Sequence, residues 1–296
     1  MSFIALDWGT SSFRAYRVGA DGAVLETIAA PQGILAVQNG AFDDALESRI
    51  GLWDKATPIL ASGMITSRQG WTELPYVACP ANLKSIAAAI RAHTSRQGRR
   101  IFFVPGISAR GSDGIPDVMR GEETQVLGAS LGGQEYFVTP GTHSKWIEVA
   151  DGDITGFATY MTGEVFAILK THSILGRLMT GDAHNDEAFA RGVTAALKDP
   201  GGFLHRIFSV RTLALFNEMP SGQLSSCLSG HVIGTEIAHA VAHHPKSAQY
   251  VILASPALAQ HYVAAMKIAG LDVRFSPPDV VVRGLASIAK TAGLIL

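Results

Sequence analysis

The sequence predicts an α/β protein whose two domains repeat the order β-β-β-α-β-α-β. Two stretches lead to this prediction, because "LDWGTSSFRAYRV" (6–18) and "VTPGTHSKWIEV" (138–149) each place Gly-Thr-x-Ser between an apolar run and an alternating one. The third observation is the length, since 296 residues exceed what one hydrophobic core usually serves. We therefore expect two similar domains.

The first half of the chain contains the elements of one such domain. Residues 2–8 form a mostly apolar run, residues 12–18 alternate, and the turn Asp21-Gly22 leads into residues 23–29, which predicts a three-strand meander. The patterns that follow predict a helix over 42–54, a strand over 58–64, a helix over 83–96, a strand over 100–107 and a helix from about Arg120.

The second half restarts the same order. Strands over 135–141 and 144–150 lead through the turn Asp151-Gly152 to a third strand over 153–161. A largely helical stretch extends to about His244, and the rest predicts a strand over 250–255, a helix over 257–270, a strand over 272–276 and a last helix from about Gly284. When the two halves of the sequence are aligned, Gly9 matches Gly141, Thr10 matches Thr142 and Ser12 matches Ser144.

Composition indicates a soluble globular protein with small-molecule ligands. Hydrophobic residues make up 47% of the chain, charged residues 17%, and the formal net charge is −1, which argues against a nucleic-acid partner. Cys79 and Cys227 lie far apart without any CxxC pair, which argues against a disulfide framework or a structural zinc site. The stretch "MSFIALDWG" lacks the features of an export signal, and no apolar run is long enough to span a membrane. We expect a cytoplasmic protein.

The repeated turns predict phosphate chemistry. A tight turn of Gly, Thr and Ser between two strands exposes backbone N–H groups and short hydroxyls, which form a concavity for phosphate oxygens. Two such turns that face each other across an interdomain cleft could hold both ends of a polyphosphate.

With these turns the sequence resembles the superfamily of acetate and sugar kinases, heat-shock-70 proteins and actin. Asp7-Trp8-Gly9-Thr10 matches the superfamily's first hairpin motif, D-x-G-T. The resemblance implies an actin-like ATPase and sugar-kinase fold of two RNase-H-like domains with an interdomain cleft, ATP and Mg²⁺ as cofactors, and a magnesium ion near Asp7, held mostly through water.

Four longer blocks resemble the 2-dehydro-3-deoxygalactonokinase family: "ASGMITSRQGWTELPYVACPA" (61–81), "PDVMRGEETQVLG" (116–128), "VTPGTHSKW" (138–146) and "LSGHVIGTEI" (228–237). This resemblance implies ATP-dependent phosphorylation of the 6-hydroxyl of 2-dehydro-3-deoxy-D-galactonate in galactonate breakdown. A kinase for the gluconate epimer stays an alternative, as does a nucleotide or polyphosphate hydrolase or an ATP-driven switch of the same superfamily.

The resemblance also gives an expected division of the chain. Residues 1–131 form the N-terminal domain, on the sugar-acid side, with the first phosphate hairpin. Residues 132–296 form the C-terminal domain, on the nucleotide side, with a helical insertion at about 165–245 and a last helix that packs back toward the N-terminal domain. A homo-oligomer is left open.

The expected site residues fall into three groups. The ATP phosphates are expected at two hairpins, formed by Asp7, Gly9, Thr10 and Ser11 and by Gly141, Thr142 and His143. A bidentate arginine suits the acceptor's carboxylate, and we expect Arg68 in this role with Ser67, Gln69 and Trp71 beside it, followed by Arg110 and Arg120 as alternatives.

The general base is expected at the start of the helix that joins the two domains. Many sugar kinases begin the second hairpin with an Asp that serves as base, but this chain has Thr139 there. The candidates are therefore three acidic residues of "PDVMRGEETQ": Asp117, Glu122 and Glu123.

Two other features depart from simple expectations. Adenosine sites of this superfamily usually carry a Gly-rich turn after the penultimate strand, whereas this chain has Ser255-Pro256, so the adenine pocket is not assigned. Glu236, His239 and His243 share one helical face with acceptable metal spacing, although a solvated or partly buried helix face explains them as well. The minimal P-loop, α/β-hydrolase and zincin motifs are absent from the sequence.

Overall fold

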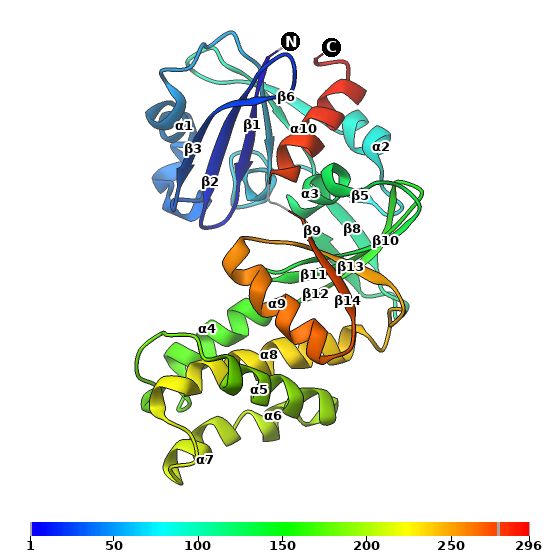
Figure 1. Ribbon diagram of the computed structural model, residues 1–296. Helices are drawn as coiled ribbons and strands as arrows, with labels where there is room; N and C mark the ends of the chain where they lie inside the picture. The colour runs from blue at the N-terminus through cyan, green and yellow to red at the C-terminus, as the bar shows by residue number, and fades with distance from the viewer. Residues whose placement is uncertain (1, 277–278, 296) are drawn as a thin grey trace. The chain divides into compact units, whose positions relative to one another are not determined.

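The computed structural model describes residues 2–276 and 279–295, which form two compact α/β units (Figure 1). The first unit comprises Met1–Gln134, Ile147–Phe157 and Pro278–Leu296. The second unit comprises Glu135–Trp146 and Ala158–Pro277.

The sheet of the first unit has the strand order β3-β2-β1-β4-β7-β6. Strands β1, β2 and β3 form the antiparallel meander that the Asp-Gly turn predicts, and β4 and β7 continue the sheet in parallel. The bounds are β1 Phe3–Trp8, β2 Phe13–Val18, β3 Val24–Ala30, β4 Ile59–Ser62, β6 Arg91–Thr94 and β7 Arg100–Phe103.

The second sheet has the order β12-β11-β10-β13-β14, which matches β3-β2-β1-β4-β7 of the first sheet, where β6 is an additional edge strand. This shared order confirms the repeated architecture. Pairing of β13 with β10 and β14 is parallel. The bounds are β10 Gln134–Thr139, β11 Ser144–Ala150, β12 Asp153–Tyr160, β13 Gln249–Leu253 and β14 Asp272–Ser276.

Helix α1 covers one face of the first sheet, and α10 and α3 lie on the other side (Figure 1). Side chains of α1 pack with alternate residues of β1, namely Ile4, Leu6 and Trp8. Alternation along the strand turns Ala5 and Asp7 toward the face of α10. The bounds are α1 Phe42–Ile50, α2 Leu83–Ala88, α3 Glu122–Ala129 and α10 Val280–Thr291.

Helices α3 and α10 cross at very short range. A Cβ atom added to Gly128 of α3 would lie 1.9 Å from the carbonyl oxygen of Val280, and one added to Gly284 of α10 would lie 1.9 Å from that of Thr124. Both positions therefore require glycine, because any side chain would overlap the backbone of the other helix. The last helix starts four residues before the predicted Gly284.

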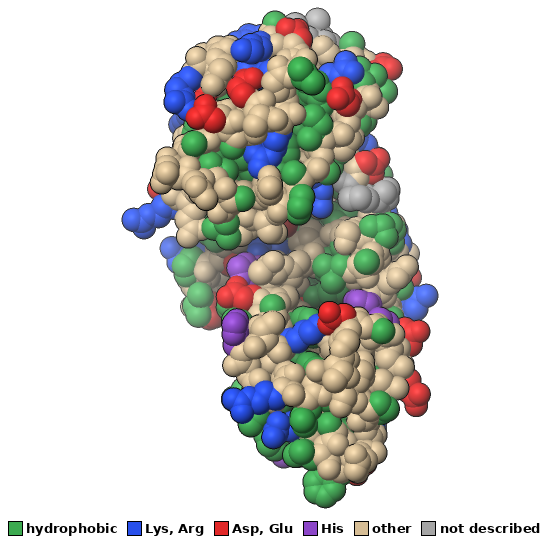
Figure 2. Space-filling view, turned by 90° about the vertical axis from the view of Figure 1, so that its left-hand side faces the viewer, with side chains coloured by type: hydrophobic (Ala, Val, Ile, Leu, Met, Phe, Trp, Pro, Cys, Tyr) green, Lys and Arg blue, Asp and Glu red, His purple; other side chains and the backbone are tan. Residues whose placement is uncertain are grey.

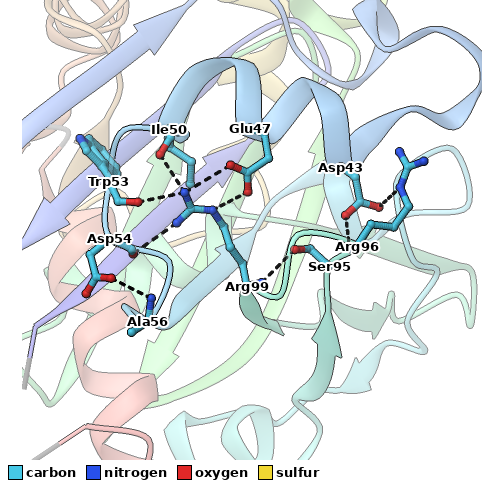
Figure 3. A network of polar contacts seen from close by, with 9 residues as sticks. All are labelled: Asp43, Glu47, Ile50, Trp53, Asp54, Ala56, Ser95, Arg96 and Arg99. Atoms are coloured by element: carbon cyan, nitrogen blue, oxygen red, sulfur yellow. Dashed lines mark hydrogen bonds and ion pairs between the residues drawn. The ribbon is translucent and has the colours of Figure 1, made fainter.

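A buried arginine closes the C-terminal end of α1 (Figure 3). The guanidinium of Arg99 is inaccessible to solvent and donates to the carbonyl oxygens of Ile50 (3.1 Å), Trp53 (3.0 Å) and Asp54 (3.3 Å). Ile50 ends α1, and Trp53 and Asp54 lie in the turn after it, so one guanidinium binds the helix end and the turn together. The Arg99 side chain thus attaches α1 to the β6–β7 turn.

Most helices of the second unit lie between Thr162 and Ala240. Helices α5 and α8 pack closely because a Cβ on Gly192 would lie 2.2 Å from the carbonyl oxygen of Cys227, and one on Gly230 would lie 2.1 Å from that of Phe189. Figure 1 shows α9 and α8 along one face of the second sheet. The bounds are α4 Thr162–His172, α5 Asp186–Lys198, α6 Phe203–Arg206, α7 Ser209–Leu215, α8 Leu224–Ala240 and α9 Pro256–Ile268.

Two predicted elements are wrong in extent. The helix expected over 83–96 ends at Ala88, and the next residues form β6, which pairs antiparallel with β7. The strand expected over 100–107 stops at Phe103, after which β5 (Val77–Ala78), β8 (Ile107–Arg110) and β9 (Pro116–Met119) form a separate three-stranded sheet. Hairpin pairing with β7 overrides the helical pattern in the first case, and pairing of β8 with β5 and β9 separates it from β7 in the second.

The surface carries charge of both signs. On the face in Figure 2, Lys and Arg side chains lie among Asp, Glu and hydrophobic side chains without a continuous field of one sign, in keeping with the formal net charge of −1. Among the residues described, no helix combines the length and the apolar character needed to cross a membrane.

Candidate functional site

The hairpin between β1 and β2 carries the first set of residues predicted to bind the ATP phosphates. Asp7 pairs in register with Arg14, whose Nη1 lies 3.4 Å from Asp7 Oδ2. Burial raises the pKa of Asp7, and the charge of Arg14 opposes that shift. The turn is closed by Gly9, whose N–H donates to the carbonyl oxygen of Ser12 at 2.9 Å. Asp7 is therefore a largely buried side chain beside a tight turn.

The tip of this hairpin is open, while its backbone is fixed from one side. Thr10 and Ser11 are exposed. The N–H of Leu35 donates to the carbonyl oxygen of Thr10 at 3.3 Å, and a Cβ on Gly33 would lie 2.2 Å from the same oxygen. The segment around Gly33 thus supports the turn and leaves its two hydroxyl groups accessible.

Asp7 lies next to the end of β4 and the start of α3. It pairs in register with Ser62, and the following Gly63 has a φ of +95° that side chains rarely adopt. A Cβ on Gly63 would lie 3.3 Å from Asp7 Oδ1, and one on Gly121 would lie 3.2 Å from Gly63 Cα. The structure therefore brings Asp7 together with the residues that begin α3.

Two acidic candidates for the general base stand in the first turn of α3. Glu123 is 1% exposed, and its carboxylate accepts from the N–H of Gly121 (2.7 Å) and from Thr124 Oγ1 (2.9 Å). Burial, together with the neighbouring charge of Glu122, raises the pKa of Glu123 to about 8. Glu122 is half-buried and accepts from the N–H of Arg120 at 3.0 Å. The two carboxylates thus have different environments.

Asp117, the third candidate, is not on this helix. It lies in β9, where it pairs in register with Ala109, and its Oδ1 accepts from the N–H of Val118 at 2.7 Å. The sequence predicted Asp117 just ahead of the helix, but the chain first completes a strand there. The side chain is half-buried.

The expected acceptor residues follow β4 in a tight loop. Arg68 and Gln69 are exposed, whereas Ser67 is buried and donates from Oγ to the carbonyl oxygen of Met64 at 2.7 Å. Arg68 is therefore accessible to a ligand, and Ser67 stabilises the turn before it.

Trp71 packs toward the core of the first unit. Its ring stacks on Phe42 with centroids 5.9 Å apart and meets Phe103 edge-on at 5.8 Å. The indole is nevertheless half-buried rather than fully enclosed.

Arg120 attaches the start of α3 to the loop after β4. Its Nη1 donates to Thr66 Oγ1 at 2.9 Å, its Nη2 donates to the carbonyl oxygen of Leu74 at 2.5 Å, and its guanidinium lies 4.0 Å from the ring centroid of Tyr76. Arg110, the other alternative, is exposed and donates to the carbonyl oxygen of Gly114 at 2.8 Å. Sequence reasoning missed the structural role of Arg120. Its position between an apolar residue and Gly-Glu-Glu gives only a weak indication that the side chain is buried.

In the second unit, the hairpin between β10 and β11 contacts the start of α4. A Cβ on Gly163 would lie 2.4 Å from the carbonyl oxygen of Gly141, and the N–H of Glu164 donates to the carbonyl oxygen of Thr142 at 3.0 Å. His143 Nε2 lies 2.5 Å from Glu164 Oε2. Thr142 and His143 are exposed, so the loop is open to a ligand.

A cavity of about 270 Å³ adjoins this hairpin within the second unit. Residues of α4, α8 and α9 line it, together with Gly141. The imidazoles of His184 and His261 stack in it with centroids 4.3 Å apart, and Lys170 Nζ lies 2.5 Å from Asp182 Oδ1. This cavity has no signal in the sequence because its walls come from five separate segments.

Glu236 takes part in a buried hydrogen-bond network instead of a metal site. Its carboxylate accepts from Trp146 Nε1 at 2.8 Å and from the hydroxyl of Tyr262 at 2.6 Å. Burial raises its pKa, which these donors oppose. The alternative that Glu236, His239 and His243 bind a metal is therefore wrong; within residues 2–276 and 279–295, no group of three or more His, Cys, Asp or Glu could hold a metal ion.

Comparisons with known proteins agree over almost the whole chain. The chain is 37% identical over 297 residues to "Probable 2-dehydro-3-deoxygalactonokinase DgoK1" of Rhizobium meliloti (strain 1021), which covers 97% of this chain and 96% of that protein. It is 32% identical over 291 residues to the 2-dehydro-3-deoxygalactonokinase of Escherichia coli (strain K12), covering 97% of each.

Solved structures agree on the fold. A crystal structure from Sinorhizobium meliloti, of a candidate 2-dehydro-3-deoxygalactonokinase, matches with a TM-score of 0.90 at 35% identity and covers 97% of this chain and 98% of that one. The activator of 2-hydroxyisocaproyl-CoA dehydratase from Clostridium difficile matches with a TM-score of 0.55 at 10% identity, covering 98% and 96%, which shows a shared fold. The architecture is the two-domain fold of actin-like ATPases and sugar kinases.

The family described as 2-keto-3-deoxy-galactonokinase matches residues 7–288, a range that runs from Asp7 of the first hairpin into α10. Together with the two relatives at 32% and 37% identity, this match shows that the chain belongs to the 2-keto-3-deoxy-galactonokinase family.

Proposed function

We propose that this protein transfers the γ-phosphoryl group of ATP to the 6-hydroxyl of 2-dehydro-3-deoxy-D-galactonate. The observation that carries the proposal is the full-length match to kinases named for this substrate. Within the first unit, the arrangement of Asp7 beside the acidic start of α3 supports it.

The residues around Asp7 suit a magnesium ion, which is the partner of ATP in phosphoryl transfer. Asp7 provides a carboxylate with 13% of its side chain exposed, and the hydroxyl of the adjacent Ser62 is buried without a hydrogen-bond partner among the described residues. Both are oxygen donors, as Mg²⁺ prefers. We assign Asp7 to hold the ion through water, and the ion neutralises phosphate charge when bound.

The nucleotide is assigned to both hairpins and to the cavity in the second unit. Thr10 and Ser11 of the first hairpin and Thr142 of the second offer accessible hydroxyls and N–H groups to phosphate oxygens. The cavity of about 270 Å³ next to Gly141 is assigned to the nucleoside, with the stacked rings of His184 and His261 as an aromatic wall.

The acceptor is assigned to the first unit. Arg68 is exposed in the loop after β4 and can donate two parallel hydrogen bonds to the carboxylate of a sugar acid. Arg120 is the weaker choice, because two of its donors already hold Thr66 and Leu74.

Glu122 is the preferred base. It is half-buried and follows the Gly121–Gly63 contact, whereas Glu123 is 1% exposed and Asp117 lies on β9. A carboxylate in this role takes the proton from the 6-hydroxyl while that oxygen attacks the γ-phosphorus and ADP leaves.

In this proposal the first unit serves the sugar acid and carries the first phosphate hairpin, the second unit serves the nucleotide, and the enzyme is cytoplasmic. ATP consumption across a panel of sugar acids tests the proposal. We expect little turnover until 2-dehydro-3-deoxy-D-galactonate is added, and far less with the gluconate epimer. Equal ATP consumption without any acceptor would instead identify a hydrolase or a switch. Preference for the gluconate epimer would overturn the substrate assignment.

A further inference from the structure

Lys145, the second residue of β11, is a buried cation without an anionic partner. It is 4% exposed, and its Nζ donates only to the carbonyl oxygen of His143, at a long 3.4 Å. No ion pair involves it in the described part of the chain. Burial of an unpaired ammonium is strongly unfavourable, so a protein that keeps one usually gives it a ligand.

The direction of the Lys145 side chain follows from its neighbours. Ser144 Oγ lies 2.8 Å from the hydroxyl of Tyr262, and Trp146 Nε1 donates to Glu236 at 2.8 Å. Ser144 and Trp146 therefore face the helices of the second unit. Because successive side chains of a strand alternate, Lys145 points to the opposite face of the sheet.

Thr139, the last residue of β10, lies on that same opposite face. The preceding Val138 packs in one cluster with Trp146, so Thr139 is turned away from it. Thr139 is 4% exposed, and its Oγ1 has no hydrogen-bond partner among the described residues. Two buried polar side chains without adequate partners thus face the same side at the base of the second hairpin.

An anion with several acceptor oxygens satisfies both groups. The ammonium donates to it as a point charge and the hydroxyl donates a neutral hydrogen bond. Because residue 139 is Thr instead of Asp, it does not neutralise Lys145, and the positive charge remains available. The loop between the two strands, Gly141 to His143, is the proposed phosphate loop.

We infer that Lys145 and Thr139 bind a phosphoryl group of the nucleotide and that Lys145 stabilises negative charge on it during transfer. This inference rests on the proposed function, since it names further residues of the ATP site. An ammonium fixed in a buried position stabilises phosphoryl charge more strongly than one in water.

The test compares Lys145→Met, Lys145→Arg and Thr139→Val with Lys267→Met, which makes the same change at an exposed lysine of α9. Isothermal titration with ATP, ADP and adenosine is done without acceptor. We expect Lys145→Met to weaken the binding of ATP, ADP or both at least tenfold and to leave adenosine binding unchanged. Lys145→Arg should lose less, and Thr139→Val should lose roughly threefold or more for the same nucleotide.

Thermal unfolding separates a ligand-binding lysine from a structural one. The melting temperature of ligand-free Lys145→Met should equal or exceed that of the wild type, because an uncompensated buried charge is gone. Wild-type affinity for ATP and ADP in both Lys145→Met and Thr139→Val would overturn the inference, and so would equal losses for adenosine and ATP. If the wild type phosphorylates its acceptor in that case, the proposed function still stands. If it binds ATP through Lys145 but phosphorylates no sugar acid, only the proposed function fails.

Discussion

Arg99 donates to both carboxylate oxygens of Glu47, from Nε to Oε1 at 2.6 Å and from Nη2 to Oε2 at 3.4 Å (Figure 3). The same guanidinium holds three backbone carbonyls at the end of α1. Removal of one partner of a buried ion pair leaves the other uncompensated, and this typically costs more than the pair itself contributes.

We expect Arg99→Ala to lower the free energy of unfolding of the first unit by about 3–5 kcal/mol, the usual cost of breaking a buried pair. Arg96→Ala is the matched control, since Arg96 lies in the same β6–β7 turn but is 64% exposed beside Asp43 and Asp44, and its loss should cost below about 1 kcal/mol. Urea unfolding of both variants provides the measurement. Equal urea midpoints for Arg99→Ala and Arg96→Ala would show that Arg99 does not stabilise α1.

Asp7→Asn tests the assigned magnesium site. The amide keeps the shape of the side chain but removes its charge, so turnover should fall at least roughly a hundredfold, as when one preorganised electrostatic group is lost. The melting temperature should change little, since burial disfavours the charged form of Asp7. Steady-state kinetics give the readout, with the exposed Asp21→Asn of the same meander as control. Near wild-type turnover in Asp7→Asn would remove Asp7 from the reaction.

The general base is identified by three amide variants. Among Asp117→Asn, Glu122→Gln and Glu123→Gln, we expect Glu122→Gln alone to lose at least roughly a hundredfold in turnover, the lower end of what removal of a general base costs. ATP affinity should stay unchanged in that variant. If all three retain more than about a tenth of the activity, no base lies in this segment. A selective loss in either other variant would move the assignment to that residue.

Arg68→Lys tests recognition of the acceptor carboxylate. Lysine keeps the charge but cannot donate two parallel hydrogen bonds, so KM for the sugar acid should rise roughly tenfold or more while KM for ATP stays constant. Arg96→Lys serves as a surface control. An unchanged KM for the sugar acid would direct attention to Arg120, whose replacement is expected to loosen the loop after β4 as well.

Glu123 predicts a pH dependence of stability. Its pKa in the folded protein is about 8, above the ordinary value of 4.5, so the folded state holds a proton that the unfolded state releases. The contribution of Glu123 to stability is therefore full below pH 4.5 and is lost as the pH rises toward about 8. Relative to Glu123→Gln, the wild type should lose stability between pH 5 and pH 8.5. If the free energies of unfolding of the two proteins changed with pH in the same way over this range, the assignment would be contradicted.

The central sheets could be predicted from sequence because their signals are local. Alternation in 12–18 and the turns Asp21-Gly22 and Asp151-Gly152 determine the two meanders, and the repeated order then determines the sheets. Strand β6 could not be predicted in this way. Its residues Arg91–Thr94 are mostly exposed and continue a helical pattern, and only the pairing with β7 makes them a strand.

The residue types of the candidate site can be read from the sequence, but the environments of those residues cannot. The acidic start of α3 is visible in "RGEET", yet only the structure shows that Glu123 accepts hydrogen bonds from its own helix start. The face that Lys145 occupies follows from contacts of its two neighbours with residues far along the chain, Ser144 with Tyr262 118 positions away and Trp146 with Glu236 90 positions away. Such relationships have no signature in a window of sequence.

The glycine contact between α3 and α10 has a consequence for biosynthesis. Helix α10, at 280–291, completes the first unit, yet the ribosome makes it only after all of the second unit. Until α10 packs against α3 at Gly284 and Gly128, the face of the first sheet that carries Asp7 lacks this helix. All of the second unit is therefore synthesised before the first unit has its last helix, and a truncated chain that stops before Val280 would leave the first unit incomplete.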